Sequence, residues 1–140
     1  MIVVDASVAL KWFVVEDGSA EALTLLSGAD PLIAPELVIG EMCNAAWRLW
    51  RIGRMTREQV GIVAEQSGRV FERVGLDGLA GRASDIALAL DHPAYDCFYL
   101  ALAEQRDATM VTADKRLVAR VAGTEWQGRV VALADYGVAP

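Results

Sequence analysis

Short apolar runs and helical apolar spacings alternate along the 140 residues of this chain. The run from Ile2 to Val4 predicts a buried β-strand. Ser7 is the expected N-cap of a helix, because apolar positions between Ala9 and Phe13 follow it at helical spacing. The chain therefore passes from a strand straight into a helix, with the acid Asp5 at the junction.

Patterns of the same kind predict the remaining elements. Further strands are expected over residues 32–34, 109–112 and 130–133, and a short edge strand over 74–76. Helices are expected over residues 20–26, 36–52, 56–72, 81–90, 94–105 and 113–121. Thr56 and Gln59 form the capping-box pattern at the beginning of the third of these helices. The tail from Tyr136 to Pro140 carries no clear signal for an element.

Strands that alternate with helices predict an α/β fold. Parallel strands need crossover helices, so the expected architecture is a three-layer α/β/α sandwich with a central, mainly parallel sheet. We expect residues 1–140 to form a single domain, since neither an internal repeat nor a linker interrupts the pattern.

Composition narrows the class of protein. Hydrophobic residues make up 54% of the chain and charged residues 23%, which is typical of a globular domain. The apolar N-terminal stretch lacks a basic leader and is interrupted by Asp5 and Lys11, so we expect no signal peptide. No run approaches the roughly 20 apolar residues of a membrane span. Cys43 and Cys97 lack metal-type spacing, so we expect reduced cysteines in a cytoplasmic protein without membrane contact.

The charge pattern leaves two interpretations. A formal net charge of −6 argues at first against a nucleic-acid partner. However, eleven of the basic residues are arginines and only two are lysines. The basic residues form two groups: Arg48, Arg51, Arg54 and Arg57 at intervals of three, and Lys115, Arg116 and Arg120. These groups are either solvated helix faces or surfaces for phosphate oxygens, which the planar guanidinium suits.

Two acids directly follow predicted strands. Asp5 follows the first strand, and Asp114 follows the strand over 109–112. Ligands of open α/β sheets bind at the carboxyl ends of strands, so these acids would face one crevice if the two strands are neighbours. Asp114 has an alternative role, because an aspartate at this position also caps a helix that begins near Lys115.

Two further acids belong to predicted helices. Glu41 lies on or beside the apolar stripe of its helix, where an unpaired carboxylate is costly. It therefore needs a salt bridge to an arginine, a place at the margin of the stripe, or a metal ion. Asp96 lies in the first turn of an almost entirely apolar helix, where the helix dipole alone favours its charge. His92, beside Pro93, is interpreted as a helix stop and not as a ligand.

Asp5, Glu41, Asp96 and Asp114 thus have separate reasons to point into one site. Carboxylates repel one another, and hard cations that prefer oxygen ligands, such as Mg²⁺ or Mn²⁺, would hold them together. Such ions can activate water and stabilise the charge that develops on a phosphate. Hydrolysis at this site would then need no catalytic histidine.

Four motifs occur in order along the chain: VVDASVALKWF, PELVIGE, HPAYDCFYLALAE and VTADKRL. In combination they resemble the PIN-domain ribonucleases, and most of all the VapC toxins of type II toxin–antitoxin systems. The resemblance extends from Ile2 to about Leu133. It implies a PIN-like fold, Mg²⁺- or Mn²⁺-dependent cleavage of RNA, dimerisation, and inhibition by a cognate antitoxin protein.

The resemblance also implies roles for particular residues. The acidic site of the family falls on Asp5, Glu41, Asp96 and Asp114, and hydroxyls near the metal fall on Ser7 and Thr112. Asp5 and Asp96 would bind the metal directly, and Asp114 would bind or support it. Glu41 would bind a second ion or orient the water. The RNA backbone would be held by Arg48, Arg51, Lys115 and Arg116.

One position departs from the family pattern. Many relatives carry a further acid shortly after the aspartate of the fourth motif, where this chain has Lys115, Arg116, Leu117 and Val118. We therefore expect one tightly held ion and a second ion that arrives with the RNA.

Two other classes of function remain open. A Mg²⁺-dependent phosphatase or phospho-acceptor module also carries an aspartate after its first strand, but such phosphatases usually need a second one where this chain has Ser7. The other alternative is a PIN-like binding module without catalysis, which the aromatic surface offered by Trp12, Phe13, Trp47 and Trp50 would suit. An antitoxin helix in an apolar groove between the early helices is compatible with either kind of activity.

Overall fold

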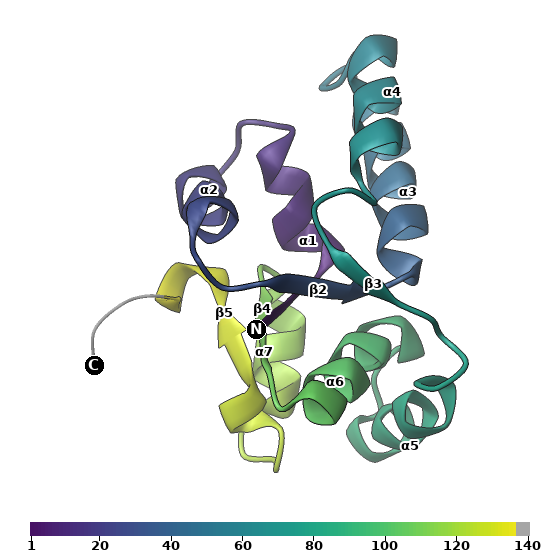
Figure 1. Cartoon of the computed structure of the whole chain (residues 1–140), viewed down its shortest axis with the longest axis vertical. Helices are drawn as coiled ribbons and strands as arrows, with labels where there is room; N and C mark the ends of the chain where they lie inside the picture. The colour runs from purple at the N-terminus through teal and green to yellow at the C-terminus, as the bar shows by residue number, and fades with distance from the viewer. Residues whose placement is uncertain (137–140) are drawn as a thin grey trace.

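A five-stranded parallel sheet forms the centre of the structure (Figure 1). The strands are β1 (Ile2–Val4), β2 (Leu32–Pro35), β3 (Glu72–Val74), β4 (Thr109–Thr112) and β5 (Val130–Ala132). Their order is β3-β2-β1-β4-β5, and every neighbouring pair is parallel. The computed structural model describes residues 1–136, so the expectation for the tail beyond Tyr136 lies outside the described residues.

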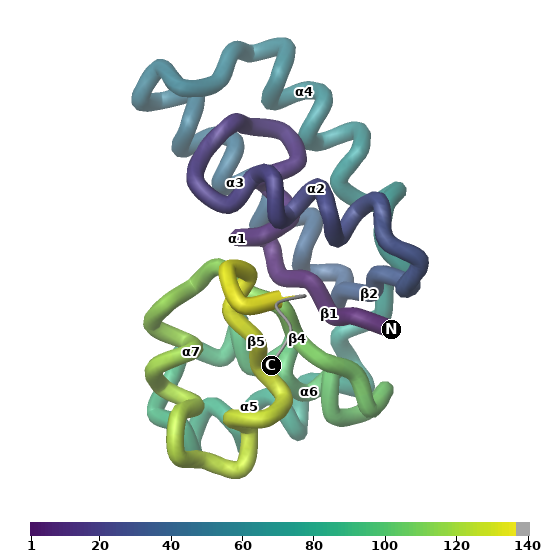
Figure 2. Tube along the Cα trace, turned by 90° about the vertical axis from the view of Figure 1, so that its left-hand side faces the viewer, coloured from purple at the N-terminus to yellow at the C-terminus, as the bar shows by residue number. Residues whose placement is uncertain are grey.

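Helices cover both faces of the sheet (Figures 1 and 2). One face carries α1 (Ala6–Ala9), which continues as a 3₁₀ turn, and then α2 (Ser19–Ser27), α3 (Leu37–Arg51) and α4 (Arg57–Gln66). The other face carries α5 (Ala80–Leu90), α6 (Ala94–Arg106) and α7 (Lys115–Val121). The predicted α/β/α sandwich with a parallel sheet is therefore confirmed.

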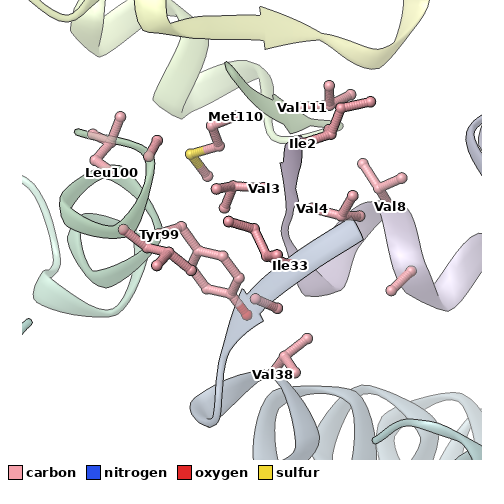
Figure 3. Close-up of a cluster of buried hydrophobic side chains, with 14 of the residues drawn as sticks. Ile2, Val3, Val4, Val8, Ile33, Val38, Tyr99, Leu100, Met110 and Val111 are labelled. Atoms are coloured by element: carbon pink, nitrogen blue, oxygen red, sulfur yellow. The ribbon is translucent and has the colours of Figure 1, made fainter. Parts of the chain in front are cut away.

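Apolar runs explain why the central strands form where they do. Val3, Val4, Ile33 and Met110 are completely buried, as expected for parallel strands covered on both faces. Figure 3 shows Tyr99 of α6 packed into the same cluster. No helix among residues 1–136 is long and apolar enough to cross a membrane.

The helix predicted over residues 56–72 is wrong at its end. The capping box of Thr56 and Gln59 is present, but α4 ends at Gln66. Gly68 follows in a close contact, where a Cβ would lie 3.0 Å from Nη1 of Arg73. The chain then enters β3, which pairs with β2 and begins two residues before the predicted edge strand. Strand pairing across the sheet thus overrides the local helical pattern.

The predicted N-cap of the first helix is also wrong. Asp5 caps α1: its backbone is extended and its Oδ1 accepts a hydrogen bond from the backbone N–H of Val8 at 3.2 Å. Ser7 lies inside the helix. The last extended residue of the strand takes the cap because α1 begins immediately after it.

The topology determines where a ligand can bind. From β1 the chain continues to β2 on one side, whereas β4 and β5 lie on the other side of β1. The strand order therefore reverses between β1 and β4. Crevices at the carboxyl ends of such strands are the usual binding sites of open α/β sheets.

Candidate active site

Asp5 lies at the carboxyl end of β1, with only 4% of its surface exposed. Its backbone N–H donates to the carbonyl oxygen of Val111 on β4 at 3.5 Å. Its Oδ1 accepts from the Ser7 hydroxyl at 2.5 Å, and its Oδ2 accepts from the Thr112 hydroxyl. The adjacent ends of β1 and β4 thus hold one carboxylate in a defined orientation.

The two hydroxyls are themselves oriented by the chain after β4. The backbone N–H of Ala113 donates to Oγ of Ser7 at 3.1 Å, and that of Asp114 donates to Oγ1 of Thr112 at 3.0 Å. Each hydroxyl accepts from the backbone and donates to Asp5. The carboxylate therefore connects both strand ends through fixed hydrogen bonds.

Burial raises the pKa of the Asp5 carboxyl to about 6. The hydrogen bonds from Ser7, Thr112 and the backbone of Val8 lower this pKa, and the negative charge of Asp96 raises it. Within residues 1–136, Asp5 forms no ion pair with a lysine, arginine or histidine. The site therefore contains a desolvated carboxylate whose charge no basic side chain neutralises.

Glu41 of α3 receives a hydrogen bond from Tyr99 of α6, whose hydroxyl lies 2.8 Å from Oε1. Burial raises the pKa of Glu41, and the charges of Asp96 and Asp5 raise it further. Of the three predicted possibilities, a salt bridge to an arginine is not found in the described part of the chain. The actual partner is a buried phenol, which the sequence did not indicate.

Asp96 and Asp114 have partners of their own. Oδ2 of Asp96 lies 2.6 Å from Nε2 of His92, so His92 does more than stop a helix. Oδ1 of Asp114 accepts from the backbone N–H of Arg116 at 2.9 Å and caps α7. The capping role considered for Asp114 is thus observed. Capping leaves Asp114 at the same opening as the other acids.

All four acids line one cavity of about 800 Å³. They come from the end of β1, the first half of α3, the first turn of α6 and the cap of α7. Among residues 1–136, no three histidine, cysteine, aspartate or glutamate side chains are close enough to hold a metal ion as a group. The structure therefore shows carboxylates around a common cavity, and direct metal ligation remains a prediction.

Two of the four basic residues predicted to bind RNA line this cavity, namely Arg48 and Arg116. Arg51 instead lies over the ring of Trp47, and Lys115 is exposed at the beginning of α7. A second hollow of about 580 Å³ shares Asp96, Asp114 and Arg116 and extends to Arg120. Positive charge thus borders the acids on two sides.

Sequence reasoning missed Asn44, Tyr95 and Tyr99 at the site, and it interpreted His92 only as a helix stop. Helical spacing could have indicated two of them. Tyr99 lies three residues after Asp96, and Asn44 lies three residues after Glu41, so each pair shares a helix face.

Comparisons with known proteins assign the chain to a family. Residues 2–123 match the PIN domain. Ribonuclease VapC3 of Pyrobaculum aerophilum is 31% identical over 83% of this chain and 91% of its own length. Ribonuclease VapC9 of Mycobacterium tuberculosis is 39% identical over 84% of this chain and 88% of its own length.

A solved structure shares the fold. A toxin–antitoxin complex from Klebsiella pneumoniae contains a chain that superposes on this one with a TM-score of 0.66. The two chains are 16% identical, and the superposition covers 95% of this chain and 98% of the other. This structure shows the fold, and the sequence matches show that the chain belongs to the PIN-domain family and, within it, to the VapC ribonucleases.

Proposed function

We propose that this protein is a Mg²⁺- or Mn²⁺-dependent endoribonuclease that acts as the toxin of a toxin–antitoxin pair. The observation that carries this proposal is the cavity into which Asp5, Glu41, Asp96 and Asp114 converge from four separate elements. The names of its VapC relatives, which are ribonucleases, support the reaction class.

The chemistry of the site fits a hard divalent cation. Its potential ligands are carboxylate oxygens, which Mg²⁺ and Mn²⁺ prefer. The raised pKa values of Asp5 and Glu41 reflect burial and, for both, repulsion by the charge of Asp96, without a basic partner. A bound cation would remove that repulsion, lower the pKa of a coordinated water and stabilise negative charge on a phosphate.

The residues of the chain divide the remaining tasks. Asp5, held by Ser7 and Thr112, and Asp96, held by His92, would bind the metal directly. Asp114 would bind or support the same ion. Glu41, oriented by Tyr99, would bind a second ion that arrives with RNA or orient the attacking water. The RNA backbone would contact Arg48 and Arg116 at the cavity, with Arg51 and Lys115 farther out.

The variant Asp5→Asn tests the nuclease proposal. It should keep the fold and lose Mg²⁺-dependent cleavage of RNA, because it removes a buried negative charge from the cavity. Asp77→Asn is the matched control, since Asp77 is exposed in the loop before α5. Full activity of Asp5→Asn, or equal cleavage with Mg²⁺ and with EDTA, would contradict the proposal. Wild-type protein without activity under all ionic conditions would favour a binding module without catalysis.

We also propose a cognate antitoxin and a homodimer as the protein partners. The structure from Klebsiella pneumoniae that contains a chain of the same fold is a toxin–antitoxin complex. A small protein encoded beside this one should therefore form a stable complex with it and suppress cleavage. The molar mass of the isolated chain in solution, measured by light scattering, tests the dimer directly.

A further inference from the structure

We propose that the far ends of α3 and α4 form a stacking platform for the bases of single-stranded RNA. The platform consists of Trp47, Trp50, Arg51 and Arg57. The proposal rests on the proposed action on RNA and adds a second binding region outside the catalytic cavity. Figure 1 shows α3 and α4 side by side, projecting away from the sheet.

Two large aromatic rings lie at the surface of the platform. Trp47 is 44% exposed and Trp50 is 38% exposed. The guanidinium carbon of Arg51 lies 5.1 Å from the ring centre of Trp47, and that of Arg57 lies 5.1 Å from the ring centre of Trp50. Trp47, Trp50 and Arg57 border, with Val60, a hollow of about 250 Å³. Planar aromatic and guanidinium groups thus alternate at one place on the surface.

The local charge is opposite to that of the whole protein. Between Met42 and Arg57 the sequence contains four arginines and no acid, although the net charge of the chain is −6. None of these arginines forms a salt bridge within residues 1–136, and all four are exposed. A surface of unpaired cations favours a polyanion over a neutral or basic partner.

The platform continues the wall of the catalytic cavity. Glu41, Asn44 and Arg48 line the cavity at helical spacing along one face of α3. Trp47 follows Asn44 after three residues, and Arg51 follows Arg48 after three residues. With a helical rise of 1.5 Å per residue, Arg51 lies about 15 Å along the helix axis from Glu41. A strand held at the acids can therefore extend along α3 to Arg51 and the ring of Trp47 beneath its guanidinium.

Stacking chemistry selects single-stranded RNA as the occupant. Bases of an unpaired strand stack on aromatic rings and on guanidinium planes, while arginines contact the phosphates. An apolar protein helix would instead need a continuous hydrophobic groove. Here a guanidinium lies over each exposed indole, so the surface is interrupted by charge.

The platform is tested by measuring the binding of an unstructured RNA of ~12 nucleotides in EDTA. This length lies within the range of known single-strand sites. The double variant Trp47→Ala, Trp50→Ala should bind about tenfold or more weakly, since each stacked base contributes a comparable factor. Arg51→Gln should make the dependence of RNA affinity on salt shallower. The slope of the logarithm of the association constant against the logarithm of salt concentration should decrease in magnitude by about 0.7. Leu88→Ala and Arg69→Gln are the matched controls, because both residues are exposed on other surfaces.

Unchanged RNA affinity in the double variant, with native circular dichroism, would overturn the platform. If the oligomeric state of the variant also changed, the surface would be assigned to a protein contact. The conservative double variant Trp47→Phe, Trp50→Phe should retain most of the RNA affinity. It serves as the control for a loss of affinity that is caused by misfolding. RNA binding in EDTA that depends on the tryptophans, together with no cleavage of RNA when Mg²⁺ is supplied, would contradict the nuclease proposal alone.

Discussion

The Tyr99 hydroxyl donates a hydrogen bond of 2.8 Å to Oε1 of Glu41 and connects helices on opposite faces of the sheet. Figure 3 shows the Tyr99 ring inside the hydrophobic cluster, with its oxygen toward the side of Val38. Burial and the charge of Glu41 raise the pKa of Tyr99, so the phenol stays protonated and remains a donor. The core of the protein thus positions an acid of the cavity directly.

Tyr99→Phe should destabilise the protein by about 1–3 kcal/mol, because the carboxylate of Glu41 loses its hydrogen bond while it remains partly buried. Urea unfolding measures this change. Tyr95→Phe is the control, since Tyr95 borders the same cavity but is 67% exposed. In a double-mutant cycle with Glu41→Gln the two effects should not be additive. Strict additivity would contradict a direct interaction between Tyr99 and Glu41.

Asp5→Asn should remove a pH-dependent loss of stability from the metal-free protein. The pKa of Asp5 is about 6 in the folded protein against 3.8 for the free side chain. Because the folded state favours the protonated acid, wild-type stability falls as pH rises from about 4 to about 6, by on the order of 3 kcal/mol in total. Asparagine does not titrate and avoids this loss.

The measurement is urea unfolding in EDTA at a series of pH values from 4 to 8. The stability of Asp5→Asn relative to wild type should increase through this range up to about pH 7 and then level off. A difference that is independent of pH would contradict a raised pKa of Asp5.

Thr112→Val should destabilise the protein and raise the pKa of Asp5. The Thr112 hydroxyl donates to Asp5, accepts from the backbone of Asp114 and is completely buried. Valine has a similar shape, but the Asp5 carboxylate and the backbone N–H of Asp114 each lose a hydrogen-bond partner. The cost is about 1–3 kcal/mol. The pH range over which stability falls should extend to higher pH, because a hydrogen bond that lowers the pKa of Asp5 is lost. Thr124→Val is the control, since the Thr124 hydroxyl also makes a hydrogen bond, to the carbonyl oxygen of Val121, but Thr124 does not line the cavity. An unchanged pH profile would show that Thr112 has no influence on Asp5.

The sheet was predictable from the sequence because its central strands are buried on both faces and consist of unbroken apolar runs. Val3 and Met110 show this directly. Where an element depends on contacts between distant segments, local pattern failed. The helix predicted to reach residue 72 ends at Gln66, because the following chain pairs with β2.

The acids could be selected from the sequence because two of them follow apolar strands and two lie in helices with apolar stripes. The partners that are distant in sequence could not be identified. Tyr99 lies 58 residues from Glu41, and Thr112 lies 107 residues from Asp5, so no local spacing connects them. Ser7 was expected to cap a helix and instead orients the neighbouring carboxylate, since Asp5 takes the cap itself.

His92→Ala should weaken the binding of Mn²⁺ by about 10- to 100-fold, the usual cost of losing a partner that orients a metal ligand. Nε2 of His92 lies 2.6 Å from Oδ2 of Asp96, and its side chain is only 9% exposed. Without this contact the Asp96 carboxylate gains rotational freedom at the cavity. Calorimetric titration with Mn²⁺ measures the effect, and His92→Gln should retain part of the affinity because its amide still donates. Asp96→Asn should no longer bind Mn²⁺. If His92→Ala nevertheless bound Mn²⁺ with unchanged affinity, Asp96 would need no orienting partner.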